Sequence, residues 1–172
     1  MEFKDVIEGR ESIRNYDPDR PINEAVLRRI LEAGRIAPSA ANRQPWTFLL
    51  ISSTELKTKI NACYPKDWFR DAPHILMVKG NRDQAWTSKF DGRNALETDL
   101  TIAMDHMILA AENEGVGTCW IAAFDTDLLR QALPLQKHEQ IFAITPLGYP
   151  RAGFEKKRLK QRKSFDEIVR FL

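Results

Sequence analysis

Cysteine is scarce in this chain, and no apolar run is long enough to cross a membrane. Only Cys63 and Cys119 are present, which excludes a disulfide framework and a CxxC metal or redox motif. No apolar run approaches the ~18 residues of a membrane helix. The start, Met1–Asp5, lacks the basic-then-apolar pattern of a signal peptide. We therefore expect a cytoplasmic protein without a membrane partner.

Catalytic and metal-binding motifs are also missing. His74, His106 and His138 lie far apart without Cys, Asp or Glu partners at the spacing of a metal site, so no metal is expected. The sequence has no Gly-x-Ser-x-Gly elbow and no Walker loop. The pair Gly115 and Gly117 follows a predicted helix instead of a strand, so it does not fit a dinucleotide-binding fingerprint. Hydrolases and nucleotide-loop enzymes are disfavoured.

Net charge is small, at +2, which argues against a nucleic-acid partner. The charge is unevenly distributed, because residues 151–163 hold seven basic residues against one acid, Glu155. The basic residues are Arg151, Lys156, Lys157, Arg158, Lys160, Arg162 and Lys163. Such a cluster favours a confined anionic partner, for example a phosphate, and a solvated charged loop is the alternative.

The length of 172 residues and the 43% apolar composition suit one folded domain, residues 1–172. Apolar periodicity predicts a short helix near residues 3–9 and a longer one capped by Asn23. Further helices are expected from Thr54, as a cap, to Ala62, from Leu100 to a terminal glycine at Gly115, and over 128–133. Ser164 and Glu167 form a capping box before an apolar C-terminal end.

Short apolar runs between these helices predict strands at 46–52, 74–78 and 141–148, the last broken by Pro146. Residues 118–122 suit a short strand or an extended loop, and 81–94 show no clear period. Helices alternating with strands indicate α/β or α+β, in two or three layers around one sheet. The apolar C-terminal tail follows a charged loop, so we expect it to pack on a second copy of the chain.

Two segments carry candidate binding residues. If residues 10–16 are extended, Arg10, Ser12 and Arg14 project to the same side, and two guanidinium groups with a hydroxyl suit a phosphate. Surface ion pairing is the alternative. In the loop 37–46, Asn42 and Gln44 both donate and accept hydrogen bonds, which suits a heterocycle edge or a sugar chain. Ordinary loop formation would also account for its Pro, Ser and Asn residues.

Five short motifs occur in the order typical of one family and cover nearly the whole chain. They are Arg10-x-Ser-x-Arg-x-Tyr16, Ala37-Pro-Ser-x-x-Asn-x-Gln-Pro-Trp46, Glu114-Gly-Val-Gly-Thr-Cys-Trp-Ile121, Pro146-Leu-Gly-Tyr-Pro150, and Lys160-x-Arg162 before Glu167-Ile-Val169. Together they make the chain resemble the nitroreductase family of FMN-dependent oxidoreductases.

The resemblance implies a nitroreductase-like α+β fold, with a central mixed sheet flanked by helices. It also implies a homodimer with an exchanged C-terminal tail and two FMN molecules at its interface. The phosphate would be held by one chain, through Arg10, Ser12, Arg14, Lys160 and Arg162. The ribityl and ring portions would meet the other chain, through Ser39, Ala40 and Asn42, with Gln44 assisting. Glu11 is an acid inside the phosphate motif, and we expect it to face the backbone or solvent.

The stretch containing Ile121 and Ala122 would run beside the isoalloxazine, with a backbone N–H near Ala122 pointing at the flavin N5. Hydride would pass from NADH or NADPH to N5, and then to a small organic acceptor such as a nitroaromatic or a quinone. No side chain is assigned as a catalytic acid or base.

Other functions stay open at this stage. One is a flavin-binding protein without nicotinamide turnover, and another is a dehalogenase or flavin-destroying relative. A nucleic-acid binder using residues 151–163 is the third.

Overall fold

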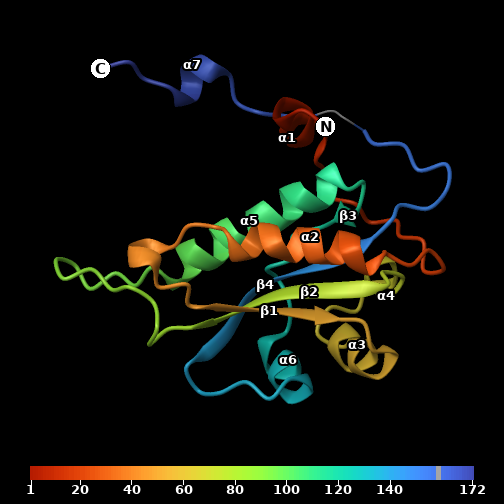
Figure 1. The fold of residues 1–172 in the computed structure, drawn as a ribbon, viewed down its shortest axis with the longest axis horizontal. Helices are drawn as coiled ribbons and strands as arrows, with labels where there is room; N and C mark the ends of the chain where they lie inside the picture. The colour runs from red at the N-terminus through yellow and green to blue at the C-terminus, as the bar shows by residue number, and fades with distance from the viewer. Residues whose placement is uncertain (158–159) are drawn as a thin grey trace.

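The computed structural model describes residues 1–157 and 160–172 (Figure 1). Its helical elements are α1 (Phe3–Gly9), α2 (Glu24–Arg35), the 3-10 turn η1 (Ala40–Asn42), α3 (Thr54–Asn61), α4 (Asp67–Arg70), α5 (Leu96–Asn113), α6 (Thr126–Ala132) and α7 (Phe165–Ile168). Its strands are β1 (Trp46–Ile51), β2 (His74–Asn81), β3 (Gly117–Thr118) and β4 (Glu139–Gly148). Arg158, one residue of the predicted basic cluster, lies outside the described residues.

The strands form a four-stranded sheet in the order β1-β2-β4-β3. All three neighbouring pairs are antiparallel. The expected mixed sheet is therefore antiparallel throughout its named strands, and parallel pairing among the described residues is confined to an isolated bridge between Ser12 and Thr118. The α+β class is confirmed.

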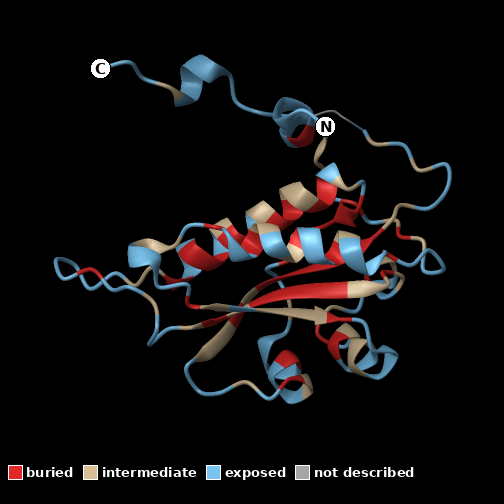
Figure 2. Ribbon diagram, viewed as in Figure 1, coloured by how far each residue is buried: buried red, intermediate tan, exposed pale blue. Residues whose placement is uncertain are grey.

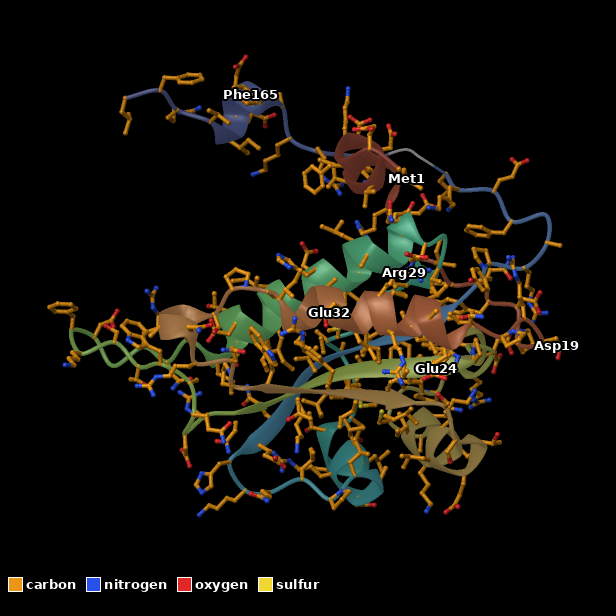
Figure 3. The ribbon with its side chains drawn as sticks, in the orientation of Figure 1. Met1, Asp19, Glu24, Arg29, Glu32 and Phe165 are labelled. Atoms are coloured by element: carbon orange, nitrogen blue, oxygen red, sulfur yellow. The ribbon has the colours of Figure 1, made fainter. Side chains whose placement is uncertain are left out.

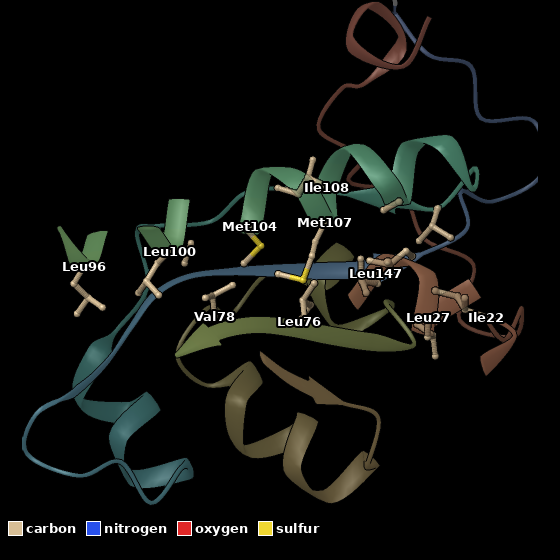
Figure 4. Close-up of a cluster of buried hydrophobic side chains, with 14 residues drawn as sticks. Ile22, Leu27, Leu76, Val78, Leu96, Leu100, Met104, Met107, Ile108 and Leu147 are labelled. Atoms are coloured by element: carbon tan, nitrogen blue, oxygen red, sulfur yellow. The ribbon is translucent and has the colours of Figure 1, made fainter. Parts of the chain in front are cut away.

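Helices cover both faces of the sheet, which gives three layers (Figure 1). On one face, α2 and α5 pack against Leu76 and Val78 of β2; Figure 4 shows this cluster. On the other face, Ile75 and Met77 of the same strand pack with residues of α3, α4 and α6. Alternating side chains of β2 thus enter two cores, which explains why its sequence is a continuous apolar run.

Two of the three helix-end residues predicted from the sequence, Asn23 and Gly115, have the predicted role in the structure. The Asn23 side chain accepts the Ala25 N–H at 2.8 Å at the start of α2. Gly115 follows α5 with φ of 71°, the left-handed conformation expected of a terminal glycine. The predicted cap Thr54 is wrong by one residue, because the Ser53 hydroxyl accepts the Leu56 N–H and Thr54 is the first residue of α3.

Pro146 does not break β4, contrary to the expectation. The Ile144 N–H points to the β3 side, where it donates to the Ile121 carbonyl at 3.0 Å. Residue 146 faces the same way, since strand geometry repeats every two residues. On that side the Cys119 N–H bonds the Thr145 hydroxyl at 3.0 Å instead of the backbone. The donor that proline lacks is therefore not required there.

Periodicity gave no structure for residues 81–94. Asn81 is the last residue of β2, and the residues between β2 and α5 fold back on themselves. Thr87 and Asn94 form an antiparallel bridge. The Ser88 N–H donates to the Arg93 carbonyl at 2.9 Å, and Phe90 at the turn is fully exposed. This segment projects from the body in Figure 1. The Arg82 N–H donates to the His138 carbonyl at 3.1 Å and Ala85 packs against the core, whereas the bridge and the Ser88 hydrogen bond are local. A turn of this kind has no apolar periodicity to detect.

The last part of the chain, from Ser164 to Leu172 and including α7, stands away from the sheet and the helices that pack on it (Figures 1 and 2). Its capping box is confirmed, with the Glu167 carboxylate accepting the Ser164 N–H at 2.8 Å. Its four large apolar side chains are exposed; they are Phe165, Ile168, Phe171 and Leu172. Figure 3 shows Phe165 well separated from α5.

Candidate functional site

Four of the predicted phosphate-binding residues lie together. Arg10, Ser12, Lys160 and Arg162 line one cavity of about 360 Å³, with Glu11 and Gln161 completing its wall. Arg10 is placed by the end of α1, where the backbone becomes extended (φ −64°, ψ 124°). Ile13 is buried, whereas Ser12 on the opposite side of the backbone is exposed, as the alternation of an extended segment requires.

Three cationic side chains, Arg10, Lys160 and Arg162, line this cavity. Burial and their mutual repulsion both affect the pKa of Lys160. Burial lowers the pKa of the Lys160 ammonium, and the nearby positive charges of Arg10 and Arg162 lower it further. A bound anion would relieve that repulsion. Glu11 accepts the Lys157 N–H at 3.2 Å, so its carboxylate joins the N-terminal motif to the basic segment.

A buried carboxylate near the end of α5 braces the same region. Glu112 is only 7% exposed and forms an ion pair with Lys156. The Lys156 ammonium also donates to the Gly9 carbonyl at 3.2 Å. This contact ties the C-terminal basic segment to the end of α1, directly beside Arg10.

Arg14 is not among the cavity residues. Its guanidinium lies over the Trp68 ring, 5.8 Å from the ring centroid. Trp68 in turn makes edge contacts with Tyr64 and Phe69. The predicted phosphate motif is thus divided, with Arg10 and Ser12 at the cavity and Arg14 held by an aromatic group that the sequence did not single out.

Residues 118–122, which begin in β3, form an extended stretch that leads from the phosphate motif to Ala122. The Ile13 N–H donates to the Thr118 carbonyl at 2.8 Å, which places the phosphate motif beside β3. The Ile121 N–H is occupied by the Ile144 carbonyl at 2.9 Å. Ala122 is exposed, and its N–H donates no hydrogen bond within the described residues. Four residues of extended chain correspond to about 13 Å, the scale of a ribityl chain and its ring.

A second cavity, of about 340 Å³, begins at Ala122. Phe124 and Phe142 supply aromatic walls, and Glu97 and Arg130 supply charges. A space of this size suits a small aromatic molecule. Ala122 therefore follows the stretch that begins beside the cation-lined cavity and lines a second cavity of mixed aromatic and charged walls.

The loop around η1 holds the other predicted residues in an unusual backbone conformation. Ala41, Asn42 and Gln44 have positive φ angles of 50°, 54° and 48°. Such left-handed residues cost roughly 1–3 kcal/mol each when they are not glycine. The Gln44 N–H donates to the Ser39 hydroxyl at 2.9 Å, and the Gln44 amide donates to the Asn42 side-chain oxygen at 3.1 Å. The two amide groups predicted from the sequence therefore lie together.

This loop and the basic cavity lie near opposite ends of α5. The Ala40 N–H donates to the carboxylate of Asp99, near the start of the helix, at 2.9 Å. Glu112, which braces the basic segment, is near its other end. A rise of 1.5 Å per residue separates Asp99 and Glu112 by about 20 Å. Within one chain, Ser39, Ala40, Asn42 and Gln44 do not line the cavity that Arg10 and Lys160 form.

Sequence reasoning missed Asp99, Glu112 and Trp68. Asp99 lies three residues after Leu96, so it occupies a position of the buried stripe of α5, and an acid at such a position is a detectable signal. Trp68 gave no signal, because its contact with Arg14 depends on how α4 packs. Among the described residues, no group of three or more His, Cys, Asp or Glu side chains is arranged to hold a metal ion.

Comparison with known proteins identifies the family. The family described as the Nitroreductase family matches residues 7–64 and 60–149. The chain belongs to this family, a class of α+β oxidoreductases. No helix among the described residues combines the length and apolarity needed to cross a membrane.

Three similar proteins illustrate the relationship. A nitroreductase family protein from Clostridium difficile has a crystal structure that superposes with a TM-score of 0.90; it is 30% identical, over 99% of this chain and 98% of that one. A protein of Thermus thermophilus named NADH dehydrogenase is 29% identical, over 87% of this chain and 88% of its own length. An FMN-dependent nitroreductase from Clostridium difficile shares the fold, with a TM-score of 0.79 at 22% identity and 96% coverage of both chains.

Proposed function

We propose that this protein is an FMN-dependent oxidoreductase that passes hydride from NADH or NADPH, through the flavin N5, to a small organic acceptor such as a nitroaromatic or a quinone. The observation that carries the proposal is the cavity lined by Arg10, Ser12, Lys160 and Arg162, joined by an extended stretch to the exposed Ala122 N–H. Membership of the Nitroreductase family supports the reaction class.

The cavity residues fit the phosphate end of FMN. A phosphate carries nearly two negative charges and accepts bidentate bonds, which guanidinium groups and a hydroxyl donate. Repulsion among Arg10, Lys160 and Arg162 is the electrostatic condition that an anion would relieve. Arg14 would assist at the rim if its guanidinium left the Trp68 ring.

When bound, FMN supplies the electron-transfer chemistry, and the protein supplies orientation and electrostatics. Ile121 is locked into the sheet by its bonds with Ile144, so it holds the next residue firmly in place. The Ala122 N–H then serves as a fixed donor to the ring. Phe124 and Phe142 supply aromatic walls to the adjoining cavity, where nicotinamide and acceptor would bind in turn.

We also propose that the site is completed by a second copy of the chain, in a homodimer. The loop carrying Ser39, Ala40 and Asn42 lies near the opposite end of α5 from the basic cavity. The exposed apolar tail, with Phe171 and Leu172, needs a surface to cover it. In a dimer with exchanged tails, each tail would be covered by the partner subunit. The same association would bring the partner's loop to this chain's basic cavity.

The visible spectrum of the purified protein tests the proposed function, recorded before and after anaerobic addition of NADH and then NADPH. We expect flavin absorption bands that bleach with at least one nucleotide and return when a nitroaromatic or quinone is added. A protein that binds FMN but is not bleached would instead be a flavin carrier without turnover. Reoxidation by a halogenated aromatic with halide release, and not by nitro compounds or quinones, would identify a dehalogenase.

A colourless protein that cannot be reconstituted with FMN would overturn the proposal. In that case a polyanion titration at several salt concentrations would show whether residues 151–163 bind nucleic acid.

A further inference from the structure

The strained loop at η1 is joined to the core through one buried acid. Asp99 is 1% exposed, and one of its carboxylate oxygens, Oδ1, accepts the Ala40 N–H at 2.9 Å. The two residues lie far apart in sequence, so this bond fixes the loop to α5 and not to its own neighbours. The Ser39 hydroxyl provides a second brace inside the loop, through the Gln44 N–H.

The other carboxylate oxygen of Asp99, Oδ2, is buried and is an unsatisfied hydrogen-bond acceptor among the described residues. A buried carboxylate with an unpaired oxygen is a costly group, because no hydrogen bond replaces the hydration that this oxygen has lost. A local conflict of this kind marks a residue retained for a purpose other than stability.

We propose that Asp99 is the positioning residue of the flavin-binding loop: its carboxylate holds the Ala40 amide, and thereby keeps Ala41, Asn42 and Gln44 in left-handed conformations that present the loop to FMN. The inference rests on the proposed function for the ligand, and on the Asp99–Ala40 bond for the mechanism. Asp99 lines neither the basic cavity nor the cavity at Ala122, so its role is to act through the loop.

Leucine tests this role, because its branched side chain has nearly the shape of aspartate but accepts no hydrogen bond. Asp99→Leu is expected to leave the thermal midpoint of the flavin-free protein unchanged or higher. FMN affinity is expected to fall by about tenfold, the loss of one charge-assisted hydrogen bond. A merely structural residue would lower both quantities together.

Two further variants complete the comparison. Asp99→Asn keeps an oxygen that can accept the Ala40 N–H, so it is expected to restore most of the FMN affinity. Asp19→Leu removes an exposed acid from the loop before α2 and is the matched control. Its FMN affinity should equal that of the unaltered protein.

The experiment combines FMN titration by fluorescence quenching, thermal unfolding, and amide hydrogen exchange of the flavin-free proteins. Faster exchange over residues 40–44 in Asp99→Leu, with a retained thermal midpoint, is the expected result. Unchanged exchange, unchanged FMN affinity, a midpoint that falls with the affinity, or an Asp99→Asn variant as weak as Asp99→Leu would each overturn the inference. If the unaltered protein binds no FMN, the proposed function fails, and hydrogen exchange still decides whether Asp99 holds the loop.

Discussion

The two ends of α5 each carry a buried acid, and the two acids are satisfied in different ways. Near the end of the helix, Glu112 pairs with the Lys156 ammonium, so charge meets charge. Near its start, Asp99 meets only the neutral Ala40 amide and leaves one oxygen without a partner among the described residues. The first contact stabilises the fold around the basic cavity, whereas the second orders a strained loop at the expense of stability.

Asp99 and Glu112 thus link one helix to the two groups of residues predicted to bind the cofactor, and the two acids lie about 20 Å apart along the helix. Because those groups lie so far from each other in one chain, we infer that each α5 contributes to two different flavin sites in a dimer. Four experiments, in order of decreasing expected effect, test the separate roles of the two ends of α5.

The largest effect is expected from charge reversal at the basic cavity. Arg10→Glu replaces a phosphate donor with an acid and should weaken FMN binding by at least about 100-fold, through one lost charge-assisted bond and one new repulsion. Arg14→Glu should also weaken FMN binding, but less, because the Arg14 guanidinium lies over the Trp68 ring and does not line the cavity. Titration by fluorescence quenching measures both, with Arg28→Glu, at an exposed ion pair of α2, as control. Variants that keep their flavin would contradict the phosphate assignment.

Glu112→Gln should destabilise the protein, in contrast to Asp99→Leu. Loss of the carboxylate leaves the Lys156 ammonium, whose side chain is only 27% exposed, without its partner. We expect the free energy of unfolding to fall by about 2–3 kcal/mol, as urea denaturation would show. Glu32→Gln, at an exposed pair with Arg35, should change it by less than about 1 kcal/mol. Equal effects in the two variants would refute the structural role of Glu112.

The pH dependence of FMN binding should report the charge of Lys160 in the basic cavity. The Lys160 pKa lies below its ordinary value of 10.5, mainly because of burial, and a phosphate binds the charged form more tightly. Affinity should therefore fall as pH rises toward 10, beginning before an ordinary lysine would titrate, by up to about tenfold. Lys160→Arg keeps its charge and should lack this decline. An identical pH profile in both proteins would show that Lys160 does not contact the phosphate.

The smallest effect is expected in the loop itself. Ala41→Gly relieves the positive φ of 50° and should raise the free energy of unfolding by a few tenths of a kcal/mol, since glycine adopts this region freely. FMN affinity should fall about twofold, because the loop becomes less ordered. Ala25→Gly, in the first turn of α2, should instead lower stability, by about 0.5–1 kcal/mol. A loss of stability in Ala41→Gly would argue against strain at this position.

Much of the basic cavity, formed by Arg10, Ser12, Lys160 and Arg162, could be predicted from the sequence. The helix ends could be predicted as well, because these features depend on residues that are close together in the chain. Alternation along the extended segment placed Arg10 and Ser12 on one side, and the family resemblance singled out Lys160 and Arg162 from the seven basic residues of the cluster. Caps such as Asn23, and the terminal glycine of α5, depend on backbone chemistry within a few residues. Such features need no knowledge of the tertiary fold.

The rest depends on contacts between distant segments. The left-handed loop is stabilised by Asp99, which is remote in sequence, and no composition rule predicts positive φ at Ala41. Arg14 leaves the cavity for Trp68 because α4 packs beside it. Pro146 is accommodated only because the facing segment bonds through the Thr145 hydroxyl. Tertiary packing decides each of these, and a single sequence does not record it.

FMN binding by a mixed dimer tests whether each flavin site is built from two subunits. One subunit carries Arg10→Glu, and the other carries Ser39→Ala with Asp99→Leu; two affinity tags isolate the heterodimer. At an FMN concentration that loads neither parent homodimer, the account predicts one FMN per heterodimer at unaltered affinity, because one site receives both defects and the other receives none. A heterodimer that binds no FMN, or a protein that forms no dimer, would contradict it.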